Sequence, residues 1–231
     1  AFNDYEVNFL SGNPLPATDT WFAGDYDAEL DQIAVFGEAS FDVTENSSIT
    51  AGGRWFDYDR KVGQFQQQPP GFTGFSQLDG SQESSEDGTV AKLNFTYKLD
   101  ADKMVYATYS EGFRVGGSNP LKPASLLPRN YSSDTLKNYE VGAKTEWMNR
   151  RVRLNVSAYY MEWEDFAVQI EDPQPAVFQL AFVNLPTAEI PGIEADLAVE
   201  INPQWQLDGS LAWNDAKTKE YHYLDAELDH T

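Results

Sequence analysis

Closely spaced carboxylates are the first residues in this sequence that could do chemistry. Glu162, Glu164 and Asp165 stand almost side by side, and a glycosidase uses two carboxylates held at a defined separation. The chain has 37 Asp and Glu residues, so close pairs arise without any catalytic role. We therefore interpret these three as the solvated edge of a strand, and we predict that the chain is not an enzyme.

The two histidines could bind a divalent metal. His222 and His230 flank Asp225, Glu227 and Asp229, and imidazole and carboxylate groups are common metal ligands. All five residues belong to one acidic stretch, which favours a surface loop. We predict no metal site and no cofactor.

The stretch EGFRVGG, residues 111–117, is rich in glycine. It lacks the Lys and the following Ser or Thr of a phosphate-binding loop. We interpret it as a bend where a strand meets a loop.

The strands that must position these groups can be recognised from residues 138–166, NYEVGAKTEWMNRRVRLNVSAYYMEWEDF, where apolar and polar residues alternate. Successive side chains of a strand point to opposite faces. A tight turn at 149–150 therefore separates two predicted strands, each with one largely apolar face. Those faces comprise Tyr139, Val141, Ala143, Thr145 and Trp147, and then Val152, Leu154, Val156, Ala158 and Tyr160.

The same period of two predicts about eight strands in all. The other six are residues 31–43, 48–58, 90–99, 103–113, 192–201 and 204–214. Strands of soluble proteins average about five or six residues, whereas a tilted strand needs about 9–11 to cross a bilayer. Most of these segments reach the longer value, which favours strands that span a membrane.

The connections between these strands alternate in length. Short turns are predicted at residues 45–47, 100–102, 149–150 and 202–204, and long loops at 60–88, 114–134 and 167–182. Outer-membrane barrels sort their connections in this way, with short turns in the periplasm and long loops outside. The predicted fold class is all-β: an antiparallel, up-and-down transmembrane β-barrel, present only in part.

Composition excludes other classes. The formal net charge of -21 argues against binding of nucleic acid, which is polyanionic and binds basic surfaces. The absence of cysteine excludes disulfides, thiolate metal sites and cysteine nucleophiles. No apolar run is long enough for a membrane-spanning helix.

Four stretches also carry a family resemblance. They are AVFGE (34–38), YATYSEGFRVGG (106–117), NYEVGAKTEW (138–147) and GIEADL (192–197) with its hairpin to LAWNDA (211–216). In this order and spacing the chain resembles the β-barrel of TonB-dependent outer-membrane receptors. One departure is Leu185–Pro186, where the family commonly has a small residue and Gly; with Pro191 it predicts a bulge or an interrupted ladder.

The resemblance implies a barrel of about 22 strands in the bacterial outer membrane, filled by a plug domain. Neither a plug nor a final strand ending in an aromatic residue is recognisable, so we expect residues 1–231 to be an internal segment of such a barrel. The implied function is TonB-coupled import of a scarce, bulky nutrient, most often a ferric siderophore. The implied partners are the lipid bilayer, lipopolysaccharide, and the TonB complex acting through the plug.

The alternative is a soluble all-β carbohydrate-binding or adhesin-like module. A sandwich of that kind would bury the apolar faces between two sheets.

Within the resemblance, ligand recognition is expected in the long outer loops. Aromatic faces and guanidinium groups suit anionic, ring-bearing iron chelates. The candidate ligand-binding residues are Phe72, Phe75, Arg114, Arg129 and Tyr131.

Overall fold

The computed structural model describes residues 3–8, 20–67, 78–119, 125–173 and 180–219. Within these ranges the regular structure is all β, and no helix is long and apolar enough to cross a membrane. The strands are β1 (Asn3–Asn8), β2 (Thr20–Thr44), β3 (Ser47–Gln67), β4 (Leu78–Lys98), β5 (Lys103–Arg114), β6 (Gly117–Ser118), β7 (Asn130–Tyr131), β8 (Asp134–Trp147), β9 (Val152–Glu171), β10 (Leu180–Asn202), β11 (Trp205–Asn214) and β12 (Lys217–Thr218).

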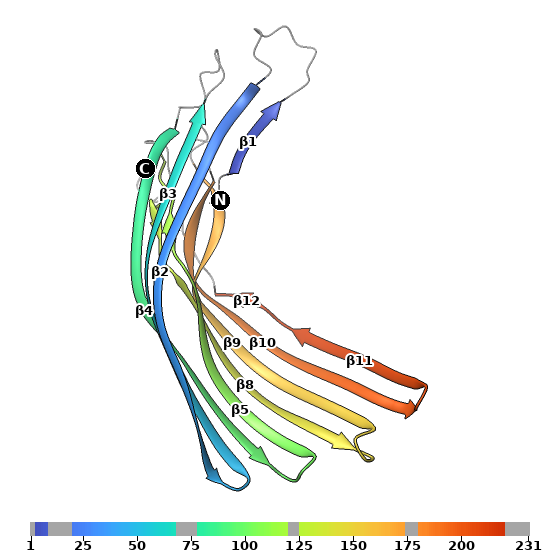
Figure 1. Ribbon diagram of the computed structural model, residues 1–231. Helices are drawn as coiled ribbons and strands as arrows, with labels where there is room; N and C mark the ends of the chain where they lie inside the picture. Colours follow the sequence, from blue (N-terminus) through green and yellow to red (C-terminus); the bar gives the residue numbers. More distant parts are fainter. Residues whose placement is uncertain (1–2, 9–19, 68–77, 120–124, 174–179, 220–231) are drawn as a thin grey trace.

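The long strands form one curved antiparallel sheet (Figure 1). Its order is β1-β2-β3-β4-β5-β8-β9-β10-β11, with β12 also paired to β10 and with β6 and β7 forming a separate hairpin. The long strands are neighbours in chain order, as in an up-and-down barrel wall. Within the described ranges β1 and β11 do not pair, so the sheet is open, and the predicted partial barrel is confirmed.

One face of the sheet is apolar and uncovered. Ile33 is 63% exposed, Phe41 71% and Leu211 70%, and all three lie in the predicted strands 31–43 and 204–214. A soluble sandwich would bury such side chains under a second sheet. Because no second sheet covers them in the described part of the chain, the structure favours lipid contact over the sandwich alternative.

The strands are much longer than the sequence suggested, so two predicted loop boundaries were wrong. β3 continues to Gln67 and β4 begins at Leu78, which leaves only residues 68–77 between them instead of 60–88. Likewise β9 ends at Glu171 and β10 begins at Leu180. The apolar belt is the band of the sheet whose apolar face is uncovered. Beyond this belt both faces of a strand can be polar, so apolar and polar residues do not alternate in the sequence of these extensions.

The four hairpin turns lie together at one end of the sheet (Figure 1). In three of them a side chain accepts from amides of the turn: Thr44 Oγ1 from Asn46 and Ser47 (3.2 and 3.0 Å), Asp100 from Asp102 (2.9 Å), and Asn202 from Gln204 and Trp205. The turn predicted at 149–150 spans residues 148–151, between the paired residues Trp147 and Val152. The predicted sorting of short turns to one end is confirmed.

The two prolines of β10 behave differently. Pro191 pairs in register with Tyr160, whereas the pairing of Pro186 with Asp165 is missing from an otherwise continuous register. Asp165 has a left-handed φ of 53°. The prediction of an interrupted ladder is therefore confirmed at Pro186 and wrong at Pro191.

Neighbouring residues of β9 provide a test of the two-faced wall. A nitroxide spin label at position 154 of the full-length protein should be accessible to oxygen and protected from a water-soluble relaxant, because Leu154 belongs to the apolar face. A label at position 155 should show the reverse, because Asn155 lines a polar groove on the other face. Equal aqueous accessibility at both positions, measured by power-saturation EPR, would contradict this orientation.

Candidate functional site

The site begins where β5 separates from β4 on the loop side of the apolar belt. The two strands pair from Lys98↔Met104 to Lys92↔Ser110, and beyond Ser110 β5 pairs only with β8. The amide of Ala91 then donates to a carboxylate oxygen of Glu111 at 2.8 Å. A side chain thus replaces the lost ladder partner.

Aromatic rings fill the space between the separated strands. Phe113 of β5 stacks on Phe56 of β3, with ring centroids 3.6 Å apart and planes 4° apart. Gly88 of β4 makes this possible, because a Cβ there would lie 2.6 Å from the Phe56 ring. Phe56 is 4% exposed, so the stack also seals the gap against water.

The segment that follows lies across the polar face of the wall in its described parts, residues 115–119 and 125–133. The hydroxyl of Tyr58 accepts a hydrogen bond from the Gly116 amide (2.9 Å), and Arg60 donates to the Gly116 carbonyl (2.9 Å) and to the Tyr131 hydroxyl (3.0 Å). β6 and β7 close the segment into a small hairpin. Two strand side chains therefore hold the first bend of the segment against β3.

Glu86 links the same wall to the far end of the segment. It accepts from the Tyr58 hydroxyl at 2.9 Å, from the Ser133 amide at 3.1 Å, and from the Ser133 hydroxyl. Burial raises the pKa of Tyr58 to about 12, and the hydrogen bond to Glu86 acts in the same direction. Tyr58 therefore remains a neutral donor at physiological pH.

An ion pair between the buried Asp134 and the half-exposed Arg114 closes the base of the segment. Asp134 is 3% exposed and accepts three hydrogen bonds from Arg114, two from Nε (3.0 Å each) and one from Nη2 (2.5 Å). It also accepts from the Ala167 amide at 3.2 Å, and the Arg114 guanidinium lies 4.5 Å from the ring centroid of Trp163. Burial tends to raise the pKa of Asp134, but the hydrogen bonds from Arg114, Trp163 and Ala167 lower it below its ordinary value.

The remaining contacts bind the segment to β10. The Asn119 side chain accepts from the Phe182 amide (2.9 Å) and donates to the Phe182 carbonyl (2.7 Å), in the manner of a strand partner. Leu127 is 5% exposed and packs in an apolar cluster with Ala181 and Val183. The segment therefore has polar anchors at both ends and an apolar anchor between them.

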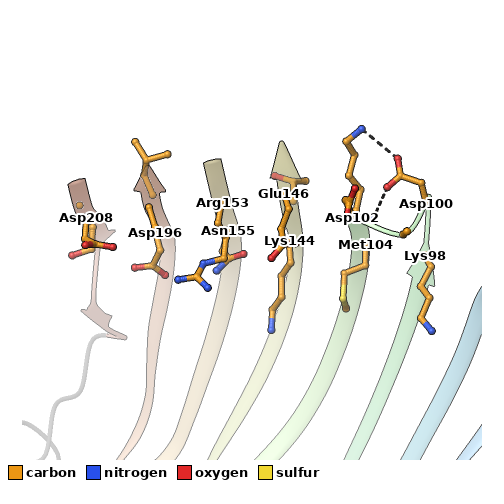
Figure 2. Close-up of a pocket in the computed structure, with 17 residues that line it drawn as sticks. Lys98, Asp100, Asp102, Met104, Lys144, Glu146, Arg153, Asn155, Asp196 and Asp208 are labelled. Carbon is orange, nitrogen blue, oxygen red and sulfur yellow. Dashed lines mark hydrogen bonds and ion pairs between the residues drawn. The ribbon is translucent and has the colours of Figure 1, made fainter. Parts of the chain in front are cut away.

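A second feature of the polar face lies at the turn end of the sheet. A groove with a cavity volume of about 1020 Å³ is lined by residues of six neighbouring strands. Figure 2 shows Asp208, Asp196, Lys144 and Lys98 projecting from four of these strands. Lys98 and Lys144 lie on the β4–β8 side of the groove and Asp196 and Asp208 on the β10–β11 side, so charges of both signs line it. Such a lining suits a polar protein surface or water better than an apolar ligand.

The predicted ligand-binding residues fall into three groups. Phe72 and Phe75 lie outside the described residues. Arg114 and Tyr131 are engaged in holding the segment, although the Arg114 side chain keeps 55% of its surface exposed. Arg129 is exposed, while its backbone carbonyl accepts from the Asn119 amide at 2.7 Å. The structure thus brings Arg129 and Tyr131 onto one anchored segment, and their role toward a ligand stays a prediction.

The other chemical candidates have different surroundings. His222 and His230 lie outside the described residues. Glu164 forms an ion pair with Lys137 at 2.6 Å, as a strand-edge carboxylate is expected to do. Among the described residues no three acidic or histidine side chains are arranged to hold a metal ion.

Sequence reasoning missed the residues that anchor the segment. Arg60 and Glu86 fell inside the predicted loop 60–88, and Tyr58 was the last residue of the predicted strand 48–58, so no strand period drew attention to them. The paired glycines 116 and 117 were the available signal, because Gly–Gly marks close backbone approach. Here a Cβ at Gly117 would lie 2.5 Å from Arg60 Nη1.

The fold and site together define a class of protein. An open antiparallel sheet with an uncovered apolar face, and with turns and loops sorted to opposite ends, is a segment of an outer-membrane β-barrel wall. The family model described as "TonB dependent receptor-like, beta-barrel" matches residues 2–229. The chain belongs to this family of transport receptors, whose β-barrels lie in the outer membrane of Gram-negative bacteria.

Curated relatives are similar to parts of this chain. The ferric-pyoverdine 358 receptor of Pseudomonas putida is 23% identical over 212 residues, which cover 88% of this chain and 24% of the relative. The pesticin receptor of Yersinia pestis is 22% identical over 176 residues, covering 76% of this chain and 24% of the relative. The chain thus spans about a quarter of the length of these curated relatives.

Solved structures show the same fold. The ferric yersiniabactin uptake receptor of Yersinia pestis superposes with a TM-score of 0.67 at 17% identity, covering 86% of this chain and 29% of that one. A copper transporter superposes with a TM-score of 0.64 at 14% identity, covering 86% and 30%.

Gly116 offers a test of the anchored segment. In Gly116→Ala the new Cβ would lie 2.5 Å from the Tyr131 carbonyl oxygen and 2.6 Å from the backbone of Ser132, neither of which can move alone. We expect a loss of roughly 1–3 kcal/mol in the free energy of unfolding and faster cleavage within residues 115–133 when intact cells are treated with protease. Gly112→Ala is the matched control, because nothing lies within 4 Å of its Cβ. Equal protease sensitivity of the two variants would contradict the anchoring.

Asp134 offers a second test. At pH 7, Asp134→Asn should lower the free energy of unfolding by about 1–3 kcal/mol, since it leaves the Arg114 guanidinium and the Ala167 amide without a charged acceptor. Because the folded-state pKa is lowered, the carboxylate's contribution is complete above its unfolded value of about 3.9 and is lost as the pH falls through the folded value. The difference between wild type and variant should therefore shrink only below about pH 4.

The measurement is urea unfolding of the full-length protein in lipid vesicles across this pH range. Asp102→Asn is the control, because Asp102 pairs with Arg150 at 3.3 Å on the exposed turn and such pairs contribute less than about 1 kcal/mol. A pH-independent difference for Asp134→Asn would show that the ion pair does not stabilise the fold.

Proposed function

We propose that this chain is an internal part of the barrel of a TonB-coupled importer, and that the full-length protein takes up a ferric siderophore. Membership of the TonB-dependent receptor family supports the transport class. The names of the relatives support the substrate class, since they include receptors for ferric pyoverdine and ferric yersiniabactin.

The fold alone does not choose the substrate. The copper transporter shares it at nearly the same TM-score as the siderophore receptor. Proteins that share a fold differ in function through the side chains that the fold carries at its binding sites. The proposal of an iron chelate therefore depends on what the outer loops of this chain present.

The observation that carries the proposal is the anchored segment at the loop end. It lies on the polar face, which is the inside of a barrel, and it is held by Tyr58, Arg60 and Asn119. A binding residue is most useful on backbone that does not need to be ordered by the ligand. The segment holds the backbone of Arg129 in this way and leaves its guanidinium exposed for an anionic ligand.

The proposed partners follow from the two ends of the polar face. We assign the mixed-charge groove at the turn end to contact with a plug domain of the full-length protein, through which the TonB complex would act. The open edges of the sheet support pairing with further barrel strands.

Arg129 and the segment 68–77 provide the test of ligand recognition. Arg129→Ala in the full-length protein should weaken binding of an anionic ferric siderophore by about tenfold or more, the loss expected for one charged hydrogen bond. Removal of residues 68–77, which takes away Phe72 and Phe75 without shortening β3 or β4, should act in the same direction. The matched control is Arg150→Ala, an equal loss of charge at the opposite end of the sheet.

The measurement is binding of radiolabelled ferric pyoverdine and ferric yersiniabactin to cells with equal surface expression. Unchanged affinity in both loop variants would remove these residues from the binding site. The transport class has a separate readout: growth on a ferric siderophore as the only iron source should require both the protein and an energised inner membrane. Growth that persists with a protonophore present would contradict TonB-coupled import.

A further inference from the structure

A row of tyrosines crosses the apolar face at the loop end of the belt. Tyr109, Tyr139 and Tyr160 are direct cross-strand partners on β5, β8 and β9. Their ring centroids are 5.1 and 6.5 Å apart along the row. Tyrosine rings of this kind mark the boundary between hydrocarbon and headgroups.

The side chains directly below the tyrosines are small. Ala107, Val141 and Ala158 form the next cross-strand row, and all three are exposed. The same row has Phe95 on one side and Ile193 on the other, so large side chains flank a low floor. The result is an apolar groove with a cavity volume of about 570 Å³, closed at its upper end by the tyrosines.

Charged residues stand directly above the tyrosines on the same face. Glu111, Lys137, Glu162 and Glu189 are successive cross-strand partners one step above that row. Lys219 pairs with Glu189 at 2.8 Å, and the Tyr109 hydroxyl donates to Glu111. The surface thus changes from apolar to charged within one step along the strands, which places the headgroup level at this row.

We propose that this groove binds one acyl chain of an outer-leaflet lipid, with the lipid's polar head at the row of Glu111, Lys137, Glu162 and Glu189. The groove is continuous with the lipid-facing belt, so hydrocarbon is the medium that reaches it. A flexible chain of methylene groups fits a groove whose base is small side chains and whose sides are large ones. Its close packing there favours a bound lipid over one that exchanges freely with the bilayer. A protein partner is disfavoured, because a stable protein interface needs about 800 Å² per partner.

The test is the number of lipids that stay bound to the purified full-length protein, measured by native mass spectrometry in a mild detergent. Ala158→Phe on β9 fills the floor of the groove, and Ala107→Leu narrows it from β5, on the other side of β8. The matched control is Ala51→Phe on β3. Ala51 is an exposed alanine of the same apolar face, outside the groove.

Wild type and Ala51→Phe should each retain one lipid above the detergent background. Ala158→Phe should reduce the fraction of barrels with that lipid by about tenfold, because the new ring overlaps a packed chain, and Ala107→Leu should reduce it as well. Heat-modifiable migration of folded barrels on gels checks that each variant folds. The proposal is overturned if wild type retains no lipid, or if folded groove variants retain as much lipid as Ala51→Phe. Neither result depends on which nutrient the protein transports.

Discussion

Backbone hydrogen bonding in hydrocarbon is the constraint on which this structure depends. An N–H or C=O group that faces lipid without a partner costs several kcal/mol, on the order of an unmade hydrogen bond in an apolar solvent. The ladders accordingly run without a shift across the apolar belt, as from Val152↔Val199 to Tyr160↔Pro191 between β9 and β10. The one pair missing between β9 and β10, Asp165 with Pro186, lies beyond the tyrosine row, where the Asn184 side chain donates to the Asp165 carbonyl.

Outside the belt the same requirement is met by side chains. Where β5 leaves β4, Glu111 accepts from the Ala91 amide; where the segment crosses β3, Tyr58 accepts from the Gly116 amide. Asn119 replaces a strand against Phe182 with one donor and one acceptor. The wall can therefore open at its loop end without leaving these backbone groups unpaired, and the opening is where a segment able to contact ligand is inserted.

The distribution of charge follows from the same division. A mean hydropathy of -0.52 and a net charge of -21 look unlike a membrane protein. A barrel strand, however, shows lipid only every second residue and only along its belt. Carboxylates collect on the polar face, in the strand extensions and in the turns, where partners such as Arg114 or Lys103 compensate some of them.

The sequence by itself determined the eight long strands, their faces, the positions of the hairpin turns and the family, because the lipid belt imposes a strict period of two on residues such as those of 139–147. It did not determine how far the strands extend, since the residues of 81–88 are polar on both faces, with Glu86 bonded to Ser133 on one of them, and show no hydrophobic period. It placed Arg114 and Tyr131 in a loop but could not show that they hold it. Those contacts join residues up to 71 positions apart, as Arg60 and Tyr131 are, and only the register of the folded sheet brings them together.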